Sequence, residues 1–338
     1  MKQVIANRAG LPEVMAVRQV PDPIPRNGEV RIRVEACGVT FRDVAARMGQ
    51  DPNAPHFPLV PGWEVAGHIE AISQGVPDLQ EGDSVIALTH YGGYSEQVCV
   101  PYQQVFKRFE WMSAQDGAAI PVSYLMAYLM LVVMGAVQPG DKVLVHGVGG
   151  SIGLAVLALG KILGIEVLGT ASPPKHEILR GHGLQHPIDY RNFDYEQVVN
   201  DLTGGRGVQL ILDSLGGRFW QKNYRLLAPT GRLIYFGLNS MMPELGRSRW
   251  AWWRGLATLP FYTPLKLMTD NRGVMGVNLS SLLLADGLRP IWMRQILSWY
   301  DEALFRPVID QTFRLDQAAE AHHYLQSRQN VGKVLLLP

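Results

Sequence analysis

Short alternating runs of apolar and polar residues dominate the first hundred positions of the chain. Segments 29–39, 64–72, 83–88 and 95–101 are rich in β-branched residues and are separated by Gly, Pro and Asp. Runs of this kind, bounded by residues that favour turns, are typical of β-strands. The pattern predicts a compact β domain in this part of the chain.

The spacing of the apolar positions changes near residue 115. Residues 115–136 carry Ala, Leu and Met at helical density before the sequence QPGD, which predicts one helix that stops there. Strands and helices then alternate: strands are expected at 142–148, 165–172, 186–190, 208–217 and 231–238, and helices at 151–164 and 175–183. Such alternation predicts a parallel sheet covered by helices on both faces.

The C-terminal part of the chain offers strands without a sheet of their own. Helices are expected at 289–305 and 316–326, and strands at 307–313 and 333–338. We expect these strands to return to the N-terminal β domain. The predicted organisation is a β domain of residues 1–118 and 289–338 around an α/β domain of residues 119–288.

A glycine-rich turn, VLVHGVGGSIGL at 143–154, joins the first strand of the α/β region to its helix. Gly150 and Gly153 match the second and third glycines of the pattern G-x-G-x-x-G, whereas Val148 takes the first position. These glycines let the backbone approach a pyrophosphate, and the helix N-terminus offers it N–H groups. The turn predicts a dinucleotide site, with a glycine-rich turn that binds no ligand as the alternative. The site would include Gly149, Gly150, Ser151, Ile152 and Gly153.

The end of the next strand indicates which dinucleotide this is. An Asp or Glu about 20 residues after the turn binds the ribose hydroxyls of NAD. The sequence here is GTASPPK, which has no carboxylate. Thr170 and Ser172 offer hydroxyls and Lys175 offers a cation, which suits the 2′-phosphate of NADPH. We therefore predict NADPH, with Lys175 as an ordinary solvated lysine being the alternative.

Charge and cysteine content bear on the partners and the cellular location of the protein. The 338 residues include 31 Lys+Arg and 30 Asp+Glu, and this balance gives no reason to expect a nucleic-acid partner. Two cysteines cannot build a disulfide framework. We see neither a signal peptide nor a run of 18 uncharged apolar residues, so we expect a cytoplasmic protein.

Several motifs resemble the medium-chain dehydrogenase/reductase superfamily from residue 25 onward. They are VLVHGVGGSIG, GTASPPKHE, HPIDY, DSLGG and NVGKVLLLP, together with ACGVTFRDVAARMG, PLVPGWEVAGHI and GGYSEQVCVP. The branch they resemble most is that of the zinc-free quinone oxidoreductases, especially the vesicle amine transport protein group. GTASPPK is also similar to the enoyl reductase domains of polyketide synthases.

The resemblance implies a GroES-like catalytic domain and a Rossmann domain that bind the nicotinamide between them, commonly within a homodimer. It implies that Tyr190 lies near the adenosine 2′-phosphate, beside Ser172 and Lys175. The same resemblance places residues 235–239 under the nicotinamide and lines the cleft with tail residues. The residues concerned are Phe236, Gly237, Leu238, Asn330 and Lys333.

Zinc alcohol dehydrogenases share this scaffold and are the main alternative class. A catalytic zinc needs about three Cys, His or carboxylate ligands. Thr40 and Phe41 lie near the first ligand position of the zinc members, and Trp63 replaces the histidine before Glu64. We therefore predict no metal and a hydride acceptor that needs none, either a quinone or an α,β-unsaturated carbonyl.

Two positions depart from the family pattern near the predicted nicotinamide. Thr40 stands where an asparagine is usual, and Met126 where Thr or Ser is common. We expect Thr40 to position the nicotinamide or substrate, and Phe41, Met126 and Tyr94 to line the substrate pocket. The departures keep open a protein that binds NADPH but turns over little.

The proton donor and one aromatic segment are left without an assigned role. Candidate donors are Tyr94, Tyr124, Tyr128 and His56, although a structural role is the favoured interpretation of each. The segment 247–254 holds three Trp and three Arg. We interpret it as a lid or a dimer contact, with a membrane surface as the alternative partner.

Overall fold

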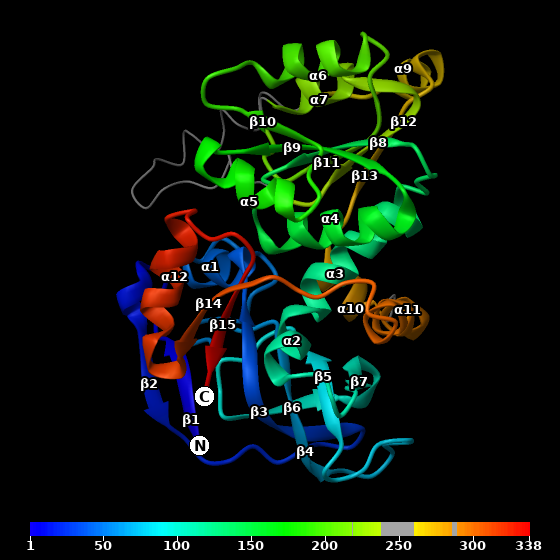
Figure 1. Cartoon of the computed structure of the whole chain (residues 1–338). Coiled ribbons are helices and arrows are strands. Elements are labelled where there is room, and N and C mark those ends of the chain that lie inside the picture. Colours follow the sequence, from blue (N-terminus) through cyan, green and yellow to red (C-terminus); the bar gives the residue numbers. More distant parts are fainter. Residues whose placement is uncertain (218, 238–259, 286–288) are drawn as a thin grey trace. The chain divides into compact units, whose positions relative to one another are not determined.

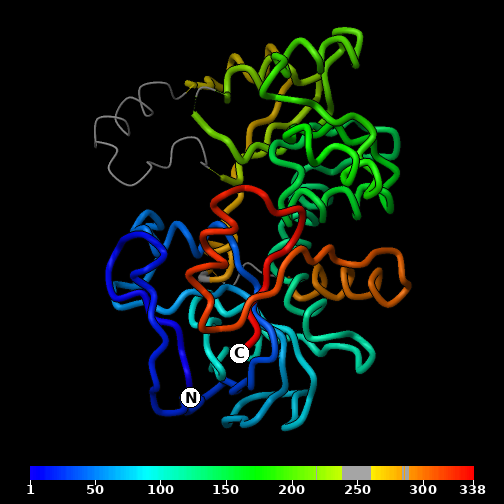
Figure 2. Tube along the Cα trace, turned by 60° about the vertical axis from the view of Figure 1, so that its left-hand side comes forward, coloured from blue at the N-terminus to red at the C-terminus, as the bar shows by residue number. Residues whose placement is uncertain are grey.

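The computed structural model describes residues 1–217, 219–237, 260–285 and 289–338 (Figure 1). It divides into two compact units. Unit 1 comprises Met1–Leu125 and Ser280–Pro338, and unit 2 comprises Met126–Leu279. The sequence places the corresponding boundaries at 118 and 289. Figure 2 shows the first and last parts of the chain, blue and red, together in unit 1.

Unit 1 is built on a mainly antiparallel seven-stranded sheet. Its strands follow the order β14-β15-β3-β4-β5-β7, and β6 also pairs with β3. The last strand of the chain, β15, runs antiparallel to β3 and places Val334 opposite Val39. The prediction that the C-terminal strands return to the N-terminal β region is therefore confirmed. The strands are β3 (Glu29–Val39), β4 (Glu64–Ile72), β5 (Ser84–Leu88), β6 (Gln97–Pro101), β7 (Val105–Lys107), β14 (Ile309–Arg314) and β15 (Lys333–Leu337).

Smaller elements complete unit 1. An antiparallel pair, β1 with β2, opens the chain, and neither strand is predicted from the apolar pattern. The alternating strands direct their β-branched side chains into one core, as the period of two requires. The elements are β1 (Lys2–Ala6), β2 (Met15–Gln19), α1 (Phe41–Arg47), α2 (Ala114–Ala119), α10 (Leu279–Leu284), α11 (Pro290–Asp301) and α12 (Ala318–Gln326).

The single helix predicted for 115–136 is wrong. The chain forms α2, then α3 (Pro121–Tyr128), and then a π-helical stretch at Leu129–Met134. Pro121 has no N–H to extend the hydrogen bonds of α2, so it takes the first position of a new helix instead. Apolar composition alone could not reveal this division.

Unit 2 contains a six-stranded parallel sheet in the order β10-β9-β8-β11-β12-β13. This is the doubly wound order, in which ligands bind at the carboxyl ends of the strands where the order reverses, here between β8 and β11. The strands are β8 (Lys142–His146), β9 (Glu166–Ala171), β10 (His186–Asp189), β11 (Val208–Asp213), β12 (Leu227–Tyr235) and β13 (Gly273–Gly276).

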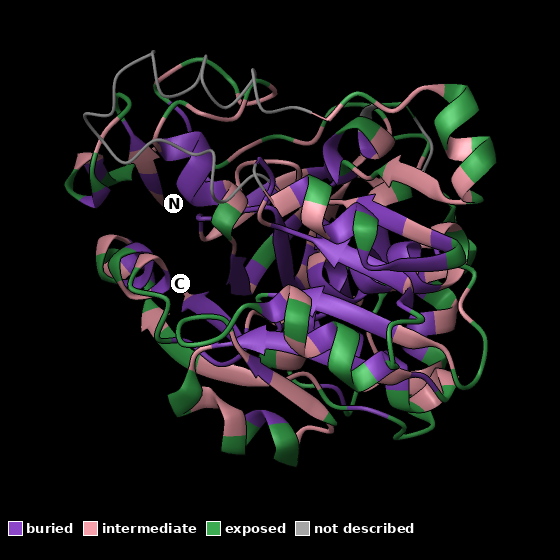
Figure 3. Cartoon of the chain, turned by 90° about the horizontal axis from the view of Figure 1, so that it is seen from above, coloured by how far each residue is buried: buried purple, intermediate pink, exposed green. Residues whose placement is uncertain are grey.

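Helices cover both faces of this sheet, as predicted. Figure 1 shows α4 and α5 on one face and α6, α7 and α9 on the other. Figure 3 shows buried residues concentrated on the strands and exposed ones on the helices and loops. The helices are α4 (Ser151–Leu163), α5 (His176–Gly181), α6 (Tyr195–Thr203), α7 (Phe219–Arg225) and α9 (Pro264–Asp270).

Candidate functional site

The glycine-rich turn lies at the point where the strand order of unit 2 reverses. Gly147 follows β8 with φ of 69°, a left-handed conformation that glycine adopts without strain. Gly150 N donates to Gly147 O over 3.1 Å and closes the turn. Gly150 is also the N-cap of α4, with no side chain to bond the free N–H groups of the first helical turn. These groups suit a phosphate.

Two glycines explain how this turn tolerates Val148. A Cβ built on Gly153 would lie 2.3 Å from the Val148 carbonyl oxygen, so only glycine lets α4 pack this closely. The Val148 side chain is buried, and a Cβ on Gly169 in β9 would lie 2.5 Å from its Cγ1. The valine therefore occupies the space that Gly169 leaves, which is why the first glycine of the pattern is dispensable here.

Lys175 lies beside the turn. It ends a short 3-10 helix, Pro173–Lys175, that follows β9, and its N–H bonds Ser172 O over 3.0 Å. A Cβ on Gly149 would lie 3.2 Å from Lys175 Cδ and 3.7 Å from its Nζ. The structure thus brings together residues from two separate sequence motifs, and it places a cation at the glycine-rich turn.

Thr170 occupies a different place from the other predicted nucleotide residues. Its side chain is buried, and its Oγ1 accepts from Gly147 N over 3.1 Å and lies 3.2 Å from His146 Nδ1. It therefore supports the turn from inside the unit. Ser172 is half-buried, and Tyr190 is 46% exposed just after β10. Contact of these three residues with a nucleotide stays a prediction.

A cavity of about 430 Å³ adjoins the ends of β9 and β10. The sequence does not point to it, because its walls come from four separate elements. Its lining residues are Pro173, His176, Pro187, Ile188, Asp189, Phe193 and Val198.

The chain leaving β12 passes close to the end of β11. Phe236 N donates to Asp213 O over 3.0 Å, and a Cβ on Gly237 would lie 2.9 Å from Ser214 O. Gly237 is therefore required by a close backbone approach. Leu238 and the segment 247–254 lie outside the described residues.

In unit 1, the hydroxyl of Thr40 is engaged with a buried carboxylate. Thr40 caps α1 and donates its Oγ1 hydrogen to Asp43 Oδ2 over 2.6 Å. Asp43 also accepts from Gly62 N over 2.8 Å. Burial raises the pKa of Asp43 to about 6. Phe41, the first residue of α1, is 37% exposed.

An aromatic cluster occupies the place where the zinc members carry a histidine ligand. Trp63 is buried, with His90 and Tyr91 edge-on at ring-centroid distances of 4.8 and 5.3 Å. Arg42 lies 4.3 Å from the Trp63 ring centroid and pairs with Asp51 over 2.8 Å. His90 and Tyr91 were not singled out by sequence, since only the fold places them against Trp63.

The carboxylate next to Trp63 is already paired. Glu64 forms a buried ion pair with Lys333 and accepts from Val122 N over 2.6 Å. Within the described ranges, no three His, Cys, Asp or Glu side chains gather as a metal site would require. Lys333 is 1% exposed, and its place along the cleft stays a prediction. The described side chains around Trp63 and Glu64 therefore do not fit a catalytic zinc.

Three further predicted residues are buried. The Tyr94 ring is fully buried and its hydroxyl lies 2.9 Å from His322 Nε2, so the ring has no face for a substrate. Its assignment to the substrate pocket stays a prediction that this burial does not support. Met126 is 5% exposed, and Asn330, also buried, donates from Nδ2 to Gly332 O over 3.0 Å. Contact of Met126 with substrate and of Asn330 with cofactor stays a prediction.

The candidate proton donors differ in accessibility. Tyr124 is buried and donates to Arg306 O over 3.4 Å, whereas His56 is exposed and Tyr128 is half-buried. No residue is assigned as the donor.

Comparison with known proteins places this architecture in a family. Residues 26–110 match the alcohol dehydrogenase GroES-like domain, and residues 182–336 match a family described as zinc-binding dehydrogenase. The synaptic vesicle membrane protein VAT-1 homolog of Rattus norvegicus is 36% identical over 329 residues, which are 95% of this chain and 80% of that protein. The chain belongs to the medium-chain dehydrogenase/reductase superfamily. Its GroES-like and Rossmann fold class is thereby confirmed.

Other members of the superfamily bear on activity. Human quinone oxidoreductase is 29% identical over 341 residues, which are 100% of this chain and 98% of that protein. The mycobacterial protein Rv1454c, solved in complex with NADPH, superposes with a TM-score of 0.87 at 26% identity and full coverage of both chains. These relatives support an oxidoreductase of the superfamily with a nicotinamide cofactor. Among the described residues, no helix has the length and apolar character needed to cross a membrane.

Proposed function

We propose that the protein is an NADPH-dependent, zinc-independent oxidoreductase that reduces a quinone or an α,β-unsaturated carbonyl compound. The observation that carries the proposal is the position of Lys175 beside Gly149, in a strand end that has no carboxylate between Val167 and His176. A cation at that place favours the 2′-phosphate, which carries about two negative charges.

Different residues of unit 2 bind different parts of the cofactor. NADPH, when bound, supplies the hydride. The turn at Gly149–Gly150 and the first N–H groups of α4 bind the pyrophosphate, and Lys175 and Ser172 bind the 2′-phosphate with Tyr190 beside it. Phe236 and Gly237 support the nicotinamide end.

The side chains of unit 1 at the position of a zinc ligand support a conjugated compound as the hydride acceptor. Trp63 replaces the histidine that would hold a zinc ion, and it is this ion that would polarise a carbonyl; Glu64 is engaged with Lys333. Conjugated acceptors need less polarisation, because the negative charge that develops is delocalised. The protein then contributes positioning and exclusion of water. The homodimer and the cytoplasmic location stay predictions.

Replacement of Lys175 by alanine tests the cofactor. We expect the Kd for NADPH to rise about tenfold or more, since a charge-assisted contact contributes roughly 1.5–3 kcal/mol. The Kd for NADH should hardly change. Lys161→Ala is the control, because Lys161 is an exposed lysine near the opposite end of α4. An unchanged preference between the two nucleotides in Lys175→Ala would contradict the proposal.

A second candidate function is a binding protein that holds NADPH with little turnover. The observation in its favour is that Thr40, the predicted positioning residue, already donates its hydroxyl hydrogen to Asp43. NADPH oxidation measured against a panel of quinones and enones separates the two. Tight NADPH binding without turnover of any acceptor would favour the binding protein.

A further inference from the structure

A chain of buried side chains runs beneath the glycine-rich turn of unit 2. It starts at Asp213, at the end of β11, whose Oδ2 accepts from Asn223 Nδ2 over 2.9 Å. Asn223 Oδ1 lies 2.9 Å from His146 Nε2, and His146 Nδ1 lies 3.2 Å from Thr170 Oγ1. Thr170 Oγ1 then accepts from Gly147 N over 3.1 Å. The chain therefore links three strand ends and terminates on the turn itself.

The direction of every hydrogen bond in this chain follows from its first member. Asp213 accepts, so the amide nitrogen of Asn223 faces it and Asn223 Oδ1 must accept from His146 Nε2–H. A neutral imidazole with its proton on Nε2 has a lone pair on Nδ1, which accepts the hydroxyl hydrogen of Thr170. That leaves a lone pair of Thr170 for the N–H of Gly147. Burial lowers the pKa of His146, consistent with a neutral ring.

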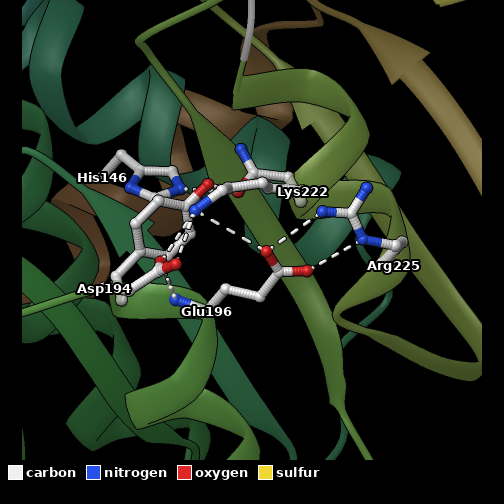
Figure 4. Close-up of polar contacts among 7 residues, drawn as sticks. His146, Asp194, Glu196, Lys222 and Arg225 are labelled. Carbon is white, nitrogen blue, oxygen red and sulfur yellow. Dashed lines mark hydrogen bonds and ion pairs between the residues drawn. The ribbon is translucent and has the colours of Figure 1, made fainter.

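The chain is anchored at its far end by helices α6 and α7. The Tyr195 hydroxyl donates to Asn223 Oδ1 over 3.0 Å. On the outside, Lys222 bonds Asp194 over 2.8 Å, and Arg225 bonds Glu196 over 2.8 Å (Figure 4). These ion pairs join α6 to α7, the helix that carries Asn223.

The same residues hold the backbone on both sides of the site. Ser214 Oγ donates to His146 O over 3.1 Å, and Val148 N donates to Thr170 O over 3.2 Å. Asp213 Oδ1 accepts from Leu215 N over 2.6 Å. The loops after β8 and β11, which flank the point where the strand order reverses, therefore depend on one set of bonds.

We propose that His146, Thr170 and Asn223 are positioning residues that fix the conformation of the phosphate-binding turn, and thereby the affinity for dinucleotide, without touching it. The three side chains are 1%, 3% and 0% exposed, so their action passes through the Gly147 backbone. This inference rests on the proposed function. It differs from the sequence-based expectation that Thr170 contacts the nucleotide.

The test compares Thr170→Val with Thr170→Ser. Valine keeps the shape of threonine but removes the hydroxyl, and we expect the Kd values for NADPH and NADH to rise together, by about five- to tenfold. Serine keeps the hydroxyl and should remain within about twofold of the wild type. A rise for NADPH alone would show a direct contact with the 2′-phosphate and would overturn the proposal.

Thr203→Val is the matched control. Thr203 is buried at the end of α6, and its Oγ1 accepts from Gly207 N over 3.2 Å and donates to Val199 O over 2.8 Å. The same hydroxyl is lost beside a glycine N–H, but away from the turn. We expect a comparable decrease of Tm with unchanged Kd. Equal Kd changes in the two variants, or none in Thr170→Val, would contradict the positioning role.

A double-mutant cycle tests whether His146 acts through Thr170. His146→Leu should raise both Kd values in the wild type but add less than about twofold in the Thr170→Val background, because the connection to the turn is already lost. Fully additive effects would overturn the inference. If His146→Leu does not fold, the comparison of Thr170→Val with Thr170→Ser alone tests the inference.

Lys175→Ala separates the two proposals. If it impairs NADPH binding and Thr170→Val leaves both nucleotides unaffected, the positioning role fails while the proposed function stands. If wild-type protein binds neither nucleotide, both fail.

Discussion

Each unit buries a group of polar side chains, but the two groups are built differently. In unit 2 the chain from Asp213 to Thr170 contains one carboxylate and otherwise neutral groups, and its members bond in sequence up to the turn. In unit 1 the buried set includes the charged side chains of Glu64, Lys333 and Arg47.

The two groups also differ in how completely their hydrogen-bonding atoms find partners. In unit 1, Arg47 donates to Gln326 over 2.8 Å, but its Nε and Nη1 and the Nδ1 of His322 find no partner within the part of the chain that the structure describes. A buried polar group without a partner is costly, whereas a satisfied network defines one conformation. In unit 2, therefore, the satisfied chain of polar side chains fixes the conformation of the glycine-rich turn.

Two of the buried polar contacts in unit 1 join segments that are distant in the sequence. Glu64 pairs with Lys333, and Tyr94 pairs with His322, which attaches the C-terminal segment to the N-terminal β region. Gly38 provides the room, since a Cβ there would lie 2.5 Å from Glu64 Oε1. Buried polar groups thus attach the C-terminal segment in unit 1, whereas in unit 2 they fix the conformation of the glycine-rich turn.

The largest effect is expected on breaking the buried ion pair of unit 1. Lys333→Met leaves the Glu64 carboxylate buried without its cation, which should lower the free energy of unfolding by about 3–5 kcal/mol. Adding Glu64→Gln should restore most of it, because the amide can still accept from Val122 N. Chemical unfolding of the variants measures both.

Lys107→Met is the control for this pair. The exposed Lys107 forms an ion pair with the partly exposed Asp83, and the loss of this pair should cost less than about 1 kcal/mol. Equal losses in Lys107→Met and Lys333→Met would show that burial does not distinguish the two pairs.

A smaller effect is expected from the packing of Val148 on Gly169 in unit 2. Gly169→Ala inserts a methyl group into the space of Val148 and should lower the free energy of unfolding by about 1–3 kcal/mol. Combined with Val148→Ala, it should cost clearly less than the sum of the two single changes. Tm and the Kd for NADPH report on both, and additive costs would argue against the packing described.

The smallest effect concerns the pH dependence of stability in unit 1. Burial, with Arg47 nearby, lowers the pKa of His322 to about 3, so the unfolded state takes up its proton first and this contribution to stability falls as pH decreases below about 6.5. Burial raises the pKa of Asp43 to about 6, so its contribution falls as pH rises from about 4 to 6. The contributions of His322 and Asp43 to stability therefore change with pH in opposite directions.

Single variants should expose each slope. Relative to wild type, His322→Gln should lose stability as pH rises from about 4 to 6, by at most about 1.4 kcal/mol per pH unit. Asp43→Asn should show the opposite sign. Unfolding midpoints measured across this range check the prediction, and slopes of the same sign in both variants would refute it.

The sequence by itself determined the parallel sheet, the glycine-rich turn and the return of the last strands to the N-terminal sheet. Each follows from local pattern: apolar runs of strand length, the glycines at 150 and 153 between a strand and a helix, and the apolar run at 334–337. Gly153 packs against Val148 and Lys175 lies beside Gly149, while the cofactor contacts predicted for both residues stay predictions. The apolar pattern failed at Pro121, whose missing N–H divides a helix of uniform composition.

Only the tertiary structure decided the rest, because those features join atoms from different strands. The register of β8 and β9 pairs Val145 with Gly169, and this brings Gly169 under Val148. The same pairing directs Thr170 inward to His146 and Gly147, although its hydroxyl looked available for a phosphate. Trp63 meets His90 and Tyr91 through the fold of unit 1. Which polar atom faces which depends on strand register and burial, and both arise from packing between segments that local sequence does not relate.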